Sequence, residues 1–93
     1  MKIIWSPKAK KDLINIADFI ARDKQSAALK WLQLVKSKVS RLSKFPRSGR
    51  MVPEIKRQDI REMIIGNYRV IYKVGTTISI LTVFHGAKQL TNL

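Results

Sequence analysis

The chain has 93 residues, 45% of them hydrophobic, with 4 glycines, 3 prolines, no cysteine and a formal net charge of +13. This composition predicts one folded domain over residues 1–93, and it excludes a disordered or collagen-like chain, disulfides and every cysteine-based nucleophile or metal site. No apolar run approaches the roughly 18 residues of a membrane span, and the polar pair Ser6-Pro7 follows the first apolar residues, so we expect a cytoplasmic protein with no membrane partner.

The positive charge lies in long stretches that have no acidic residue. Between Asp23 and Glu54 the sequence has eight lysines and arginines and no acid, and residues 63–93 have no acid either. A solvated helix face is the commoner reason for a short run of charge, but two such stretches favour a surface of one sign. Such a surface attracts polyanions, either nucleic acid or acidic protein segments.

The N-terminal residues have the pattern of a strand followed by a helix. Residues 2–5 are predicted to form a short strand. Ser6 is a residue type that caps free helix amides, and Pro7 supplies a suitable backbone angle at the first helical position. Apolar residues then recur at helical spacing, which predicts a first helix from Pro7 to about Arg22.

A second apolar run at helical spacing begins at Ala28. It predicts a second helix that ends before Phe45-Pro46, because the residue before a proline avoids the helical region. Only the polar residues 23–26 separate the two runs, so the two helices are expected to form an antiparallel hairpin.

The second half of the chain is predicted to be β-structure. Residues 47–54 form a connecting loop, and the segments 60–65 and 68–74 are rich in β-branched and aromatic residues. The two-residue turn Gly66-Asn67 between them is a strong hairpin signal, and residues 78–84 supply a further strand. The order β-α-α-β-β-β predicts an α+β fold with the helical hairpin packed on one face of a small antiparallel sheet.

The tight turn also fixes which residues share a face of the sheet. With Gly66-Asn67 as the loop, Ile64 lies opposite Arg69 and Arg61 lies opposite Tyr72. We expect the face of Tyr72 to be covered by the helices, with Arg61 near its rim and its exposure left open. The other face is expected to be uncovered and cationic at its centre, with Glu62, Ile64, Arg69, Ile71 and Lys73.

The residue types exclude most enzyme classes. The glycines fit neither a phosphate loop nor a dinucleotide fingerprint, and one histidine with six scattered acids predicts no metal site and no cofactor. Cleavage of RNA by its own 2′-hydroxyl remains possible, because it needs only charge neutralisation and proton transfer. The candidates for that chemistry are Arg69, Arg61, His85, Arg47 and Arg50. On composition alone, a structural histidine and a solvated arginine are the commoner roles.

The chain resembles the RelE/ParE toxin superfamily of type II toxin-antitoxin modules over nearly its whole length. The resemblance is carried by residues 45–54 (FPRSGRMVPE), by the hairpin of residues 60–72 (IREMIIGNYRVIY) and by residues 83–88 (VFHGAK). It implies the β-α-α-β-β-β fold and a toxin that a cognate antitoxin with an acidic segment neutralises.

The resemblance implies one of two activities. The superfamily contains ribosome-dependent messenger-RNA endonucleases similar to RelE or YoeB, and inhibitors of DNA gyrase similar to ParE. Arg69 matches the strand arginine that the nucleases use at the scissile phosphate, and His85 lies near a histidine used by YoeB-like members. The nucleases also carry a lysine pair on the preceding strand, where this chain has Arg61 before Glu62 and Met63, and a tyrosine near the C terminus, which this chain lacks.

These departures favour the ParE-like interpretation, an inhibitor of DNA gyrase. The nuclease, with Arg69, His85 and Arg61 as its catalytic residues and the ribosome and messenger RNA as its partners, is the alternative. A basic binding module without toxicity is a third possibility. In either toxin we expect no cofactor and no metal. The residues predicted to contact the target or the antitoxin are Arg47, Arg50, Lys73 and Lys88.

Overall fold

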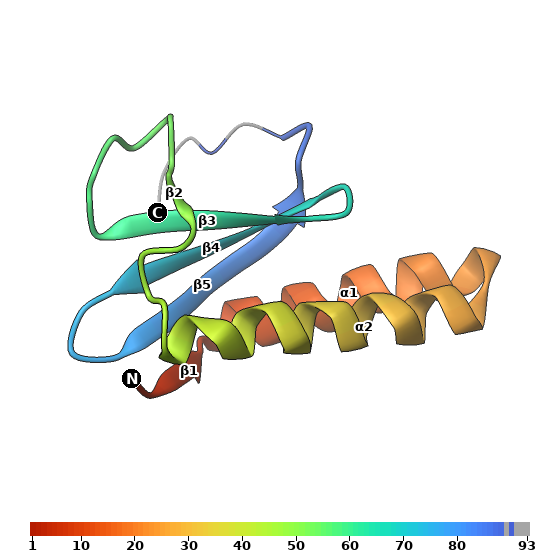
Figure 1. Ribbon diagram of the computed structural model, residues 1–93. Coiled ribbons are helices and arrows are strands. Elements are labelled where there is room, and N and C mark those ends of the chain that lie inside the picture. Colours follow the sequence, from red (N-terminus) through yellow and green to blue (C-terminus); the bar gives the residue numbers. More distant parts are fainter. Residues whose placement is uncertain (89, 91–93) are drawn as a thin grey trace.

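The computed structural model describes residues 1–88 and 90, and it places two helices against one face of a five-stranded sheet (Figure 1). The helices are α1 (Pro7–Asp23) and α2 (Gln25–Ser40), followed by the short 3₁₀ helix η1 (Arg41–Ser43). The strands are β1 (Ile3–Trp5), β2 (Arg50–Met51), β3 (Ile60–Ile65), β4 (Tyr68–Val74) and β5 (Ile78–His85). Within the described residues, neither helix is long and apolar enough to cross a membrane.

The predicted helical hairpin is confirmed. The Ser6 hydroxyl accepts a hydrogen bond from the Ala9 amide at 3.0 Å, as expected of a cap, and Pro7 is the first residue of α1. Only Lys24 separates the two helices, and its extended backbone turns the chain back on itself. α2 starts earlier than predicted, at Gln25, because the polar residues before Ala28 complete its first turn.

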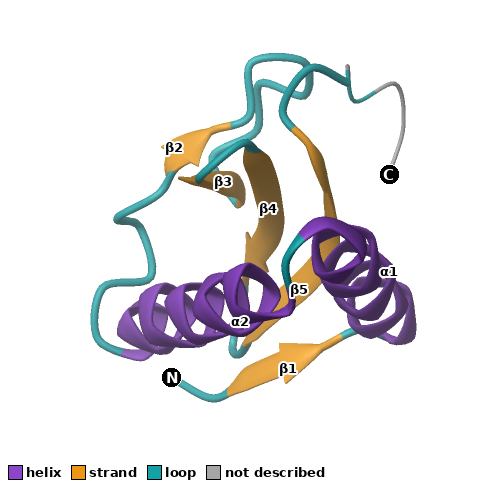
Figure 2. Cartoon of the chain, turned by 90° about the vertical axis from the view of Figure 1, so that its right-hand side faces the viewer, coloured by secondary structure: helices purple, strands orange, loops and turns teal. Residues whose placement is uncertain are grey.

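The sheet has the order β1-β5-β4-β3-β2, and it is mixed where an antiparallel sheet was predicted. β3 and β4 pair in the predicted register, with Ile64 opposite Arg69 and Arg61 opposite Tyr72. β1, however, lies parallel to β5, because the helical hairpin returns the chain to the far side of the sheet before the antiparallel strands begin (Figure 2). β2 was not predicted either, because a strand of two residues is too short to show an alternating pattern.

The main core lies between the helices and the sheet. Trp31, Val35 and Val39 of α2 pack there with Val70 and Tyr72 of β4, so the predicted helix-covered face is confirmed. The Tyr72 hydroxyl donates to the Pro46 carbonyl and accepts from the Gly49 amide, both at 2.9 Å. This side chain therefore ties the segment after η1 to the sheet.

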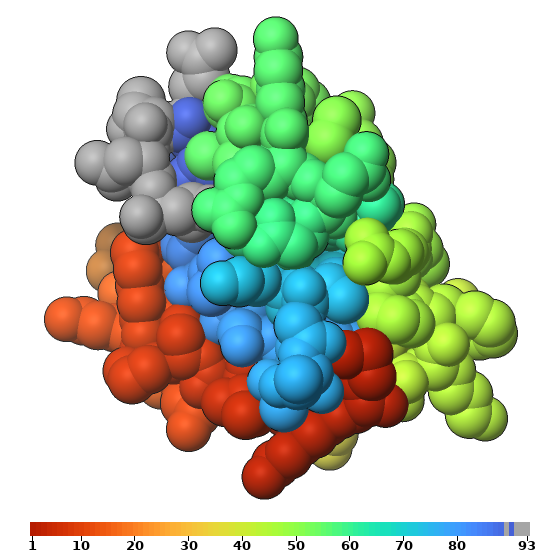
Figure 3. Space-filling model, turned by 90° about the vertical axis from the view of Figure 1, so that its left-hand side faces the viewer, coloured from red at the N-terminus to blue at the C-terminus, as the bar shows by residue number. Residues whose placement is uncertain are grey.

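The other face of the sheet is covered as well, which corrects the prediction of an open cationic face. Val52, Ile60 and Ile71 form a second buried cluster, with Phe84 and Leu90 packed against it. The segment after β2 crosses this face and forms the green region over the blue strands in Figure 3. The strand pattern could not reveal this cover, because it is made by loops.

Candidate functional site

Arg69 lies at the centre of this covered face and is only 6% exposed. Its Nε donates to Oε1 of Glu62 at 2.7 Å, and its Nη1 and Nη2 donate to the two oxygens of Glu54 at 2.7 and 2.8 Å. Nη1 also donates to the Lys88 carbonyl at 3.1 Å, and the guanidinium lies over the Phe84 ring. Every nitrogen of the guanidinium thus already donates to a carboxylate.

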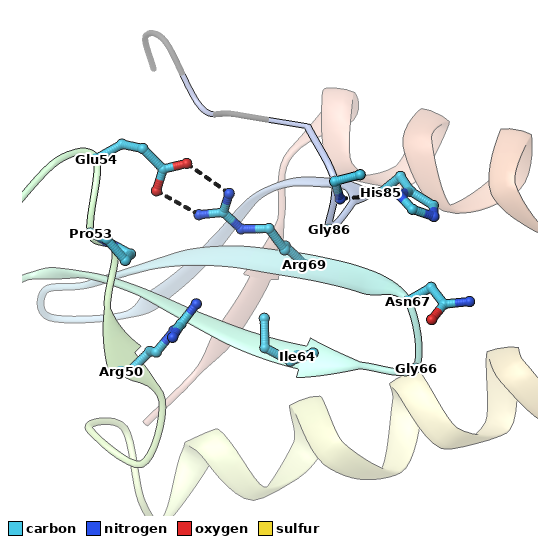
Figure 4. Close-up of a pocket in the computed structure, with 10 residues that line it drawn as sticks. Arg50, Pro53, Glu54, Ile64, Gly66, Asn67, Arg69, His85 and Gly86 are labelled. Atoms are coloured by element: carbon cyan, nitrogen blue, oxygen red, sulfur yellow. Dashed lines mark hydrogen bonds and ion pairs between the residues drawn. The ribbon is translucent and has the colours of Figure 1, made fainter.

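The two carboxylates connect Arg69 to three other parts of the chain. Glu62, which is 1% exposed, also accepts from Nε of Arg50 in β2 at 2.5 Å. Glu54, in the loop after β2, also accepts from the Leu90 amide at 2.9 Å. Figure 4 shows the paired bonds between Arg69 and Glu54. We call Arg50, Glu54, Glu62 and Arg69 the ion network.

Hydrogen bonding within the ion network shifts the pKa of its members. The hydrogen bonds from Arg69, and then that from the Leu90 amide, lower the pKa of Glu54 to about 2. The same bonds to Glu54 raise the pKa of Arg69 above its ordinary value, although its burial opposes this. Arg69 therefore stays charged at every accessible pH.

Acidification is expected to destabilise the protein between about pH 4.5 and 2 through Glu54. Because the pKa of Glu54 is 4.5 ordinarily and about 2 in the fold, its contribution is complete above pH 4.5 and is lost as the pH falls toward 2. The difference between these two pKa values corresponds to about 3 to 4 kcal/mol of stability at roughly 1.4 kcal/mol per pKa unit. Urea unfolding measured over this range should show a steeper decline for the wild type than for Glu54→Gln. An equally steep decline in both proteins would show that protonation of Glu54 does not cause the loss of stability.

A shallow groove of about 650 Å³ lies beside the ion network, lined by Arg50, Ile64, Arg69 and His85 among others. It brings two of the predicted nuclease residues, Arg69 and His85, to one surface. Their side chains nevertheless diverge: Arg69 turns toward Glu54, and His85 points away from it at the far end of the strand (Figure 4). Nδ1 of His85 accepts from the Ala87 amide at 3.0 Å, just after the end of β5.

The third predicted nuclease residue, Arg61, lies on the other face of the sheet, at its rim. Its Nη1 donates to the Gly49 carbonyl at 2.9 Å, and its Nε and Nη2 donate to Gln58 at 3.0 and 3.1 Å. Arg61 therefore fastens the loops on both sides of β2. The structure does not bring Arg61, Arg69 and His85 together.

The four residues predicted to contact a target or antitoxin are all exposed, and they lie on different parts of the chain. Arg50 is held by Glu62, and Nη1 of Arg47 donates to the Gln58 carbonyl at 3.3 Å. Lys73 lies near the end of β4, and Lys88 follows β5. Contact of these residues with a target or an antitoxin remains a prediction.

The strand register places Glu62 and Arg69 on the same face of the sheet, and the structure confirms it by an ion pair between them, but nothing in the sequence pattern singled out Glu54. Glu54 lies 15 residues before Arg69, in a loop without periodic pattern. One available signal was the scarcity of acids: in a chain with 19 basic residues and only six acids, each acid is a candidate for a specific ion pair.

Comparisons with known proteins agree with one another. The family model described as "ParE toxin of type II toxin-antitoxin system, parDE" matches residues 3–90. A protein of Sinorhizobium fredii named "Putative toxin Y4kP" is 30% identical over 90 residues, which cover 95% of this chain and 91% of that protein. A solved structure titled "Chromosomal ParDE TA system from P. aeruginosa" superposes with a TM-score of 0.74 at 25% identity, covering 91% of this chain and 95% of the other.

Proposed function

This chain belongs to the ParE toxin family of type II toxin-antitoxin systems, and on that premise we propose that it arrests growth by inhibiting DNA gyrase until a cognate antitoxin neutralises it. The observation that favours gyrase over messenger RNA as the target is that Arg69 is already bound to two carboxylates of the chain itself. A metal-free nuclease needs a free cation at the scissile phosphate. Here the carboxylates of Glu54 and Glu62 already bind the guanidinium of Arg69.

The remaining proton-transfer groups support the same choice. A nuclease of this kind needs a general acid and a general base, each supplying about 10² to 10⁴ in rate. His85 is the only histidine of the chain, and its Nδ1 is used by the Ala87 amide. The sequence has no tyrosine after Tyr72 and no lysine pair on β3. A toxin that acts by binding to a protein target needs none of these groups.

One preparation of the toxin, assayed on both targets, tests the proposal. We expect inhibition of DNA supercoiling by gyrase, and intact messenger RNA on programmed ribosomes. His85→Ala serves as the diagnostic variant, because His85 is exposed and outside the ion network. Codon-positioned cleavage that disappears in His85→Ala, with supercoiling unaffected by the wild type, would establish the nuclease instead. A protein that arrests no growth when expressed would support the basic binding module.

The proposed antitoxin is a small protein with an acidic segment. The P. aeruginosa structure is titled as a ParDE system, and we extend that pairing to this chain. The net charge of +13 favours a partner of opposite sign, and a segment that folds on binding can wrap a large surface. The product of the adjacent reading frame is expected to co-purify with the toxin at moderate salt.

A further inference from the structure

One flank of α2 carries a line of basic side chains. Lys30, Lys38 and Arg41 lie on it, because eight and three residues are close to two turns and one turn of a helix, and Lys44 follows just after η1. Lys30, Arg41 and Lys44 are exposed, and Lys38 is partly exposed. We call these four residues the α2 stripe. They belong neither to the ion network nor to the lining of the groove beside it.

The α2 stripe lies on the side of the helix away from α1. Lys38 and Arg41 line a shallow hollow of about 460 Å³ together with Met63 of β3. The opposite flank of α2 faces α1, because Leu32 lines a different groove together with Leu13 of α1. The far end of the stripe belongs to the yellow-green region on the right of Figure 3, at the surface of the molecule. A large ligand can therefore approach the stripe from solvent.

No acidic side chain pairs with the α2 stripe in the part of the chain that the structure describes. The ion pairs there use other cations, namely Lys8, Arg50, Arg57 and Arg69. The sequence has no acid between Asp23 and Glu54, and Glu54 already binds Arg69. The stripe therefore presents positive charge that the described residues leave uncompensated.

Basic side chains near the end of a helix often bond its last carbonyls, but at the end of α2 other groups make these bonds. The Ser40 hydroxyl donates to the Ser37 carbonyl at 2.7 Å, and the Ser43 hydroxyl donates to the Ser40 carbonyl at 3.0 Å. The Arg41 carbonyl accepts from two backbone amides of the following turn. The cations of the stripe are therefore available to an external anion.

The length of the α2 stripe suits a phosphate backbone. The chain rises about 16 Å from Lys30 to Arg41, because each helical residue adds about 1.5 Å. The phosphates of one strand of B-DNA follow one another about every 3.4 Å along the duplex axis, so this length spans roughly five of them. A rigid helix thus holds its lysines and arginine along a regular row of negative charges.

We propose that the α2 stripe binds the phosphate backbone of duplex DNA. An acidic protein segment fits less well, because a segment that folds on a surface buries apolar side chains, and Leu34 is the exposed apolar residue between the cations of α2. DNA is also the molecule on which gyrase acts, so the inference adds a second ligand to the proposed inhibition. That link to gyrase rests on the proposed function, whereas the DNA contact itself is tested without gyrase.

Fluorescence anisotropy of a short labelled DNA duplex, titrated with the toxin alone, tests the proposal. We expect affinity to fall with salt with a log-log slope of about −3 to −4, because each of four phosphate contacts contributes about −0.9. The double variant Lys38→Glu/Arg41→Glu should weaken binding at least about tenfold at low salt and reduce the size of the slope by about 2. The milder Lys30→Gln, which lies far from the end of the helix, should reduce the slope by about 1.

Lys11→Glu/Arg22→Glu is the matched control. It makes the same change in net charge on exposed residues of α1, and Arg22 lies in the last turn of α1 as Lys38 does in α2. Both double variants therefore alter the overall field of the protein and a helix end alike. We expect the control to weaken binding no more than about threefold and to leave the slope unchanged, because it removes no phosphate contact.

Three results would overturn the inference, and each leaves the proposed inhibition of gyrase intact. Equal weakening by both double variants would show that net charge alone attracts DNA. Tighter binding of a single strand than of the duplex, lost in Phe45→Ser, would assign the surface to an unpaired base stacked on that ring, which is 64% exposed and lines the hollow.

The third result concerns an acidic protein. If Lys38→Glu/Arg41→Glu abolishes binding of the adjacent gene product and leaves DNA binding unchanged, the stripe belongs to that protein instead. Conversely, a toxin that binds DNA through the stripe but leaves supercoiling by gyrase unaffected would contradict the proposed function alone.

Discussion

Replacing Arg69 with alanine is expected to lower the free energy of unfolding by about 3 to 5 kcal/mol, because it leaves two carboxylates without their buried partner. Glu62 is fully buried and would keep only Arg50, while Glu54 would keep only the Leu90 amide. The change also releases the Lys88 carbonyl, so the segment after β5 loses an anchor. Urea unfolding at neutral pH, followed by circular dichroism, measures the effect.

Arg57→Ala is the matched control for this experiment. Arg57 forms an equally short ion pair with Asp59, at 2.7 Å, but both side chains lie at the surface. An exposed pair of this kind contributes about 0 to 1 kcal/mol. A loss of stability in Arg69→Ala no larger than that in Arg57→Ala would show that the ion network has no structural role.

This expectation changes how a loss of toxicity in Arg69→Ala is read. In a nuclease, loss of activity in such a variant would indicate a catalytic arginine. Here the variant is expected to unfold far more readily than the wild type, so inactivity alone assigns no chemistry to Arg69. His85→Ala is the better probe, because the bond of His85 to the Ala87 amide is exposed.

The second large effect is expected for Gly49→Ala, which should cost about 2 to 3 kcal/mol of stability. An added Cβ would lie 2.5 Å from the Glu62 carbonyl oxygen and 2.5 Å from the Tyr72 hydroxyl. The carbonyl belongs to the backbone of β3 and the phenol is buried, so neither can move aside cheaply. Relaxation would also stretch the hydrogen bond from the Gly49 amide to the Tyr72 hydroxyl.

Gly75→Ala provides the comparison, because it makes the same chemical change in an open turn. There the nearest atom to an added Cβ is the Thr77 carbonyl oxygen at 3.8 Å, an ordinary contact distance. We expect a change within about 0.5 kcal/mol. Thermal unfolding of the two variants side by side distinguishes the sites, and equal midpoints would contradict the close approach at Gly49.

The sequence by itself determined the parts of the fold that depend on neighbouring residues. Periodic apolar residues and the Ser6-Pro7 start specify the helical hairpin, because a helix closes its hydrogen bonds within one segment. The tight turn at Gly66-Asn67 specifies the register of β3 and β4, because a two-residue loop leaves little freedom in pairing. The same register placed Glu62 and Arg69 on one face of the sheet, where they form an ion pair.

The tertiary structure decided everything that joins distant segments. It placed β1 parallel to β5, added β2 at the sheet edge and laid a loop and the segment after β5 over the second face. Through that cover Arg69, predicted at the centre of an open cationic face, became the buried centre of the ion network with Glu54. Burial and pairing of this kind depend on which loop covers which strand. Since loops have no periodic pattern, their path is set by packing across the whole molecule.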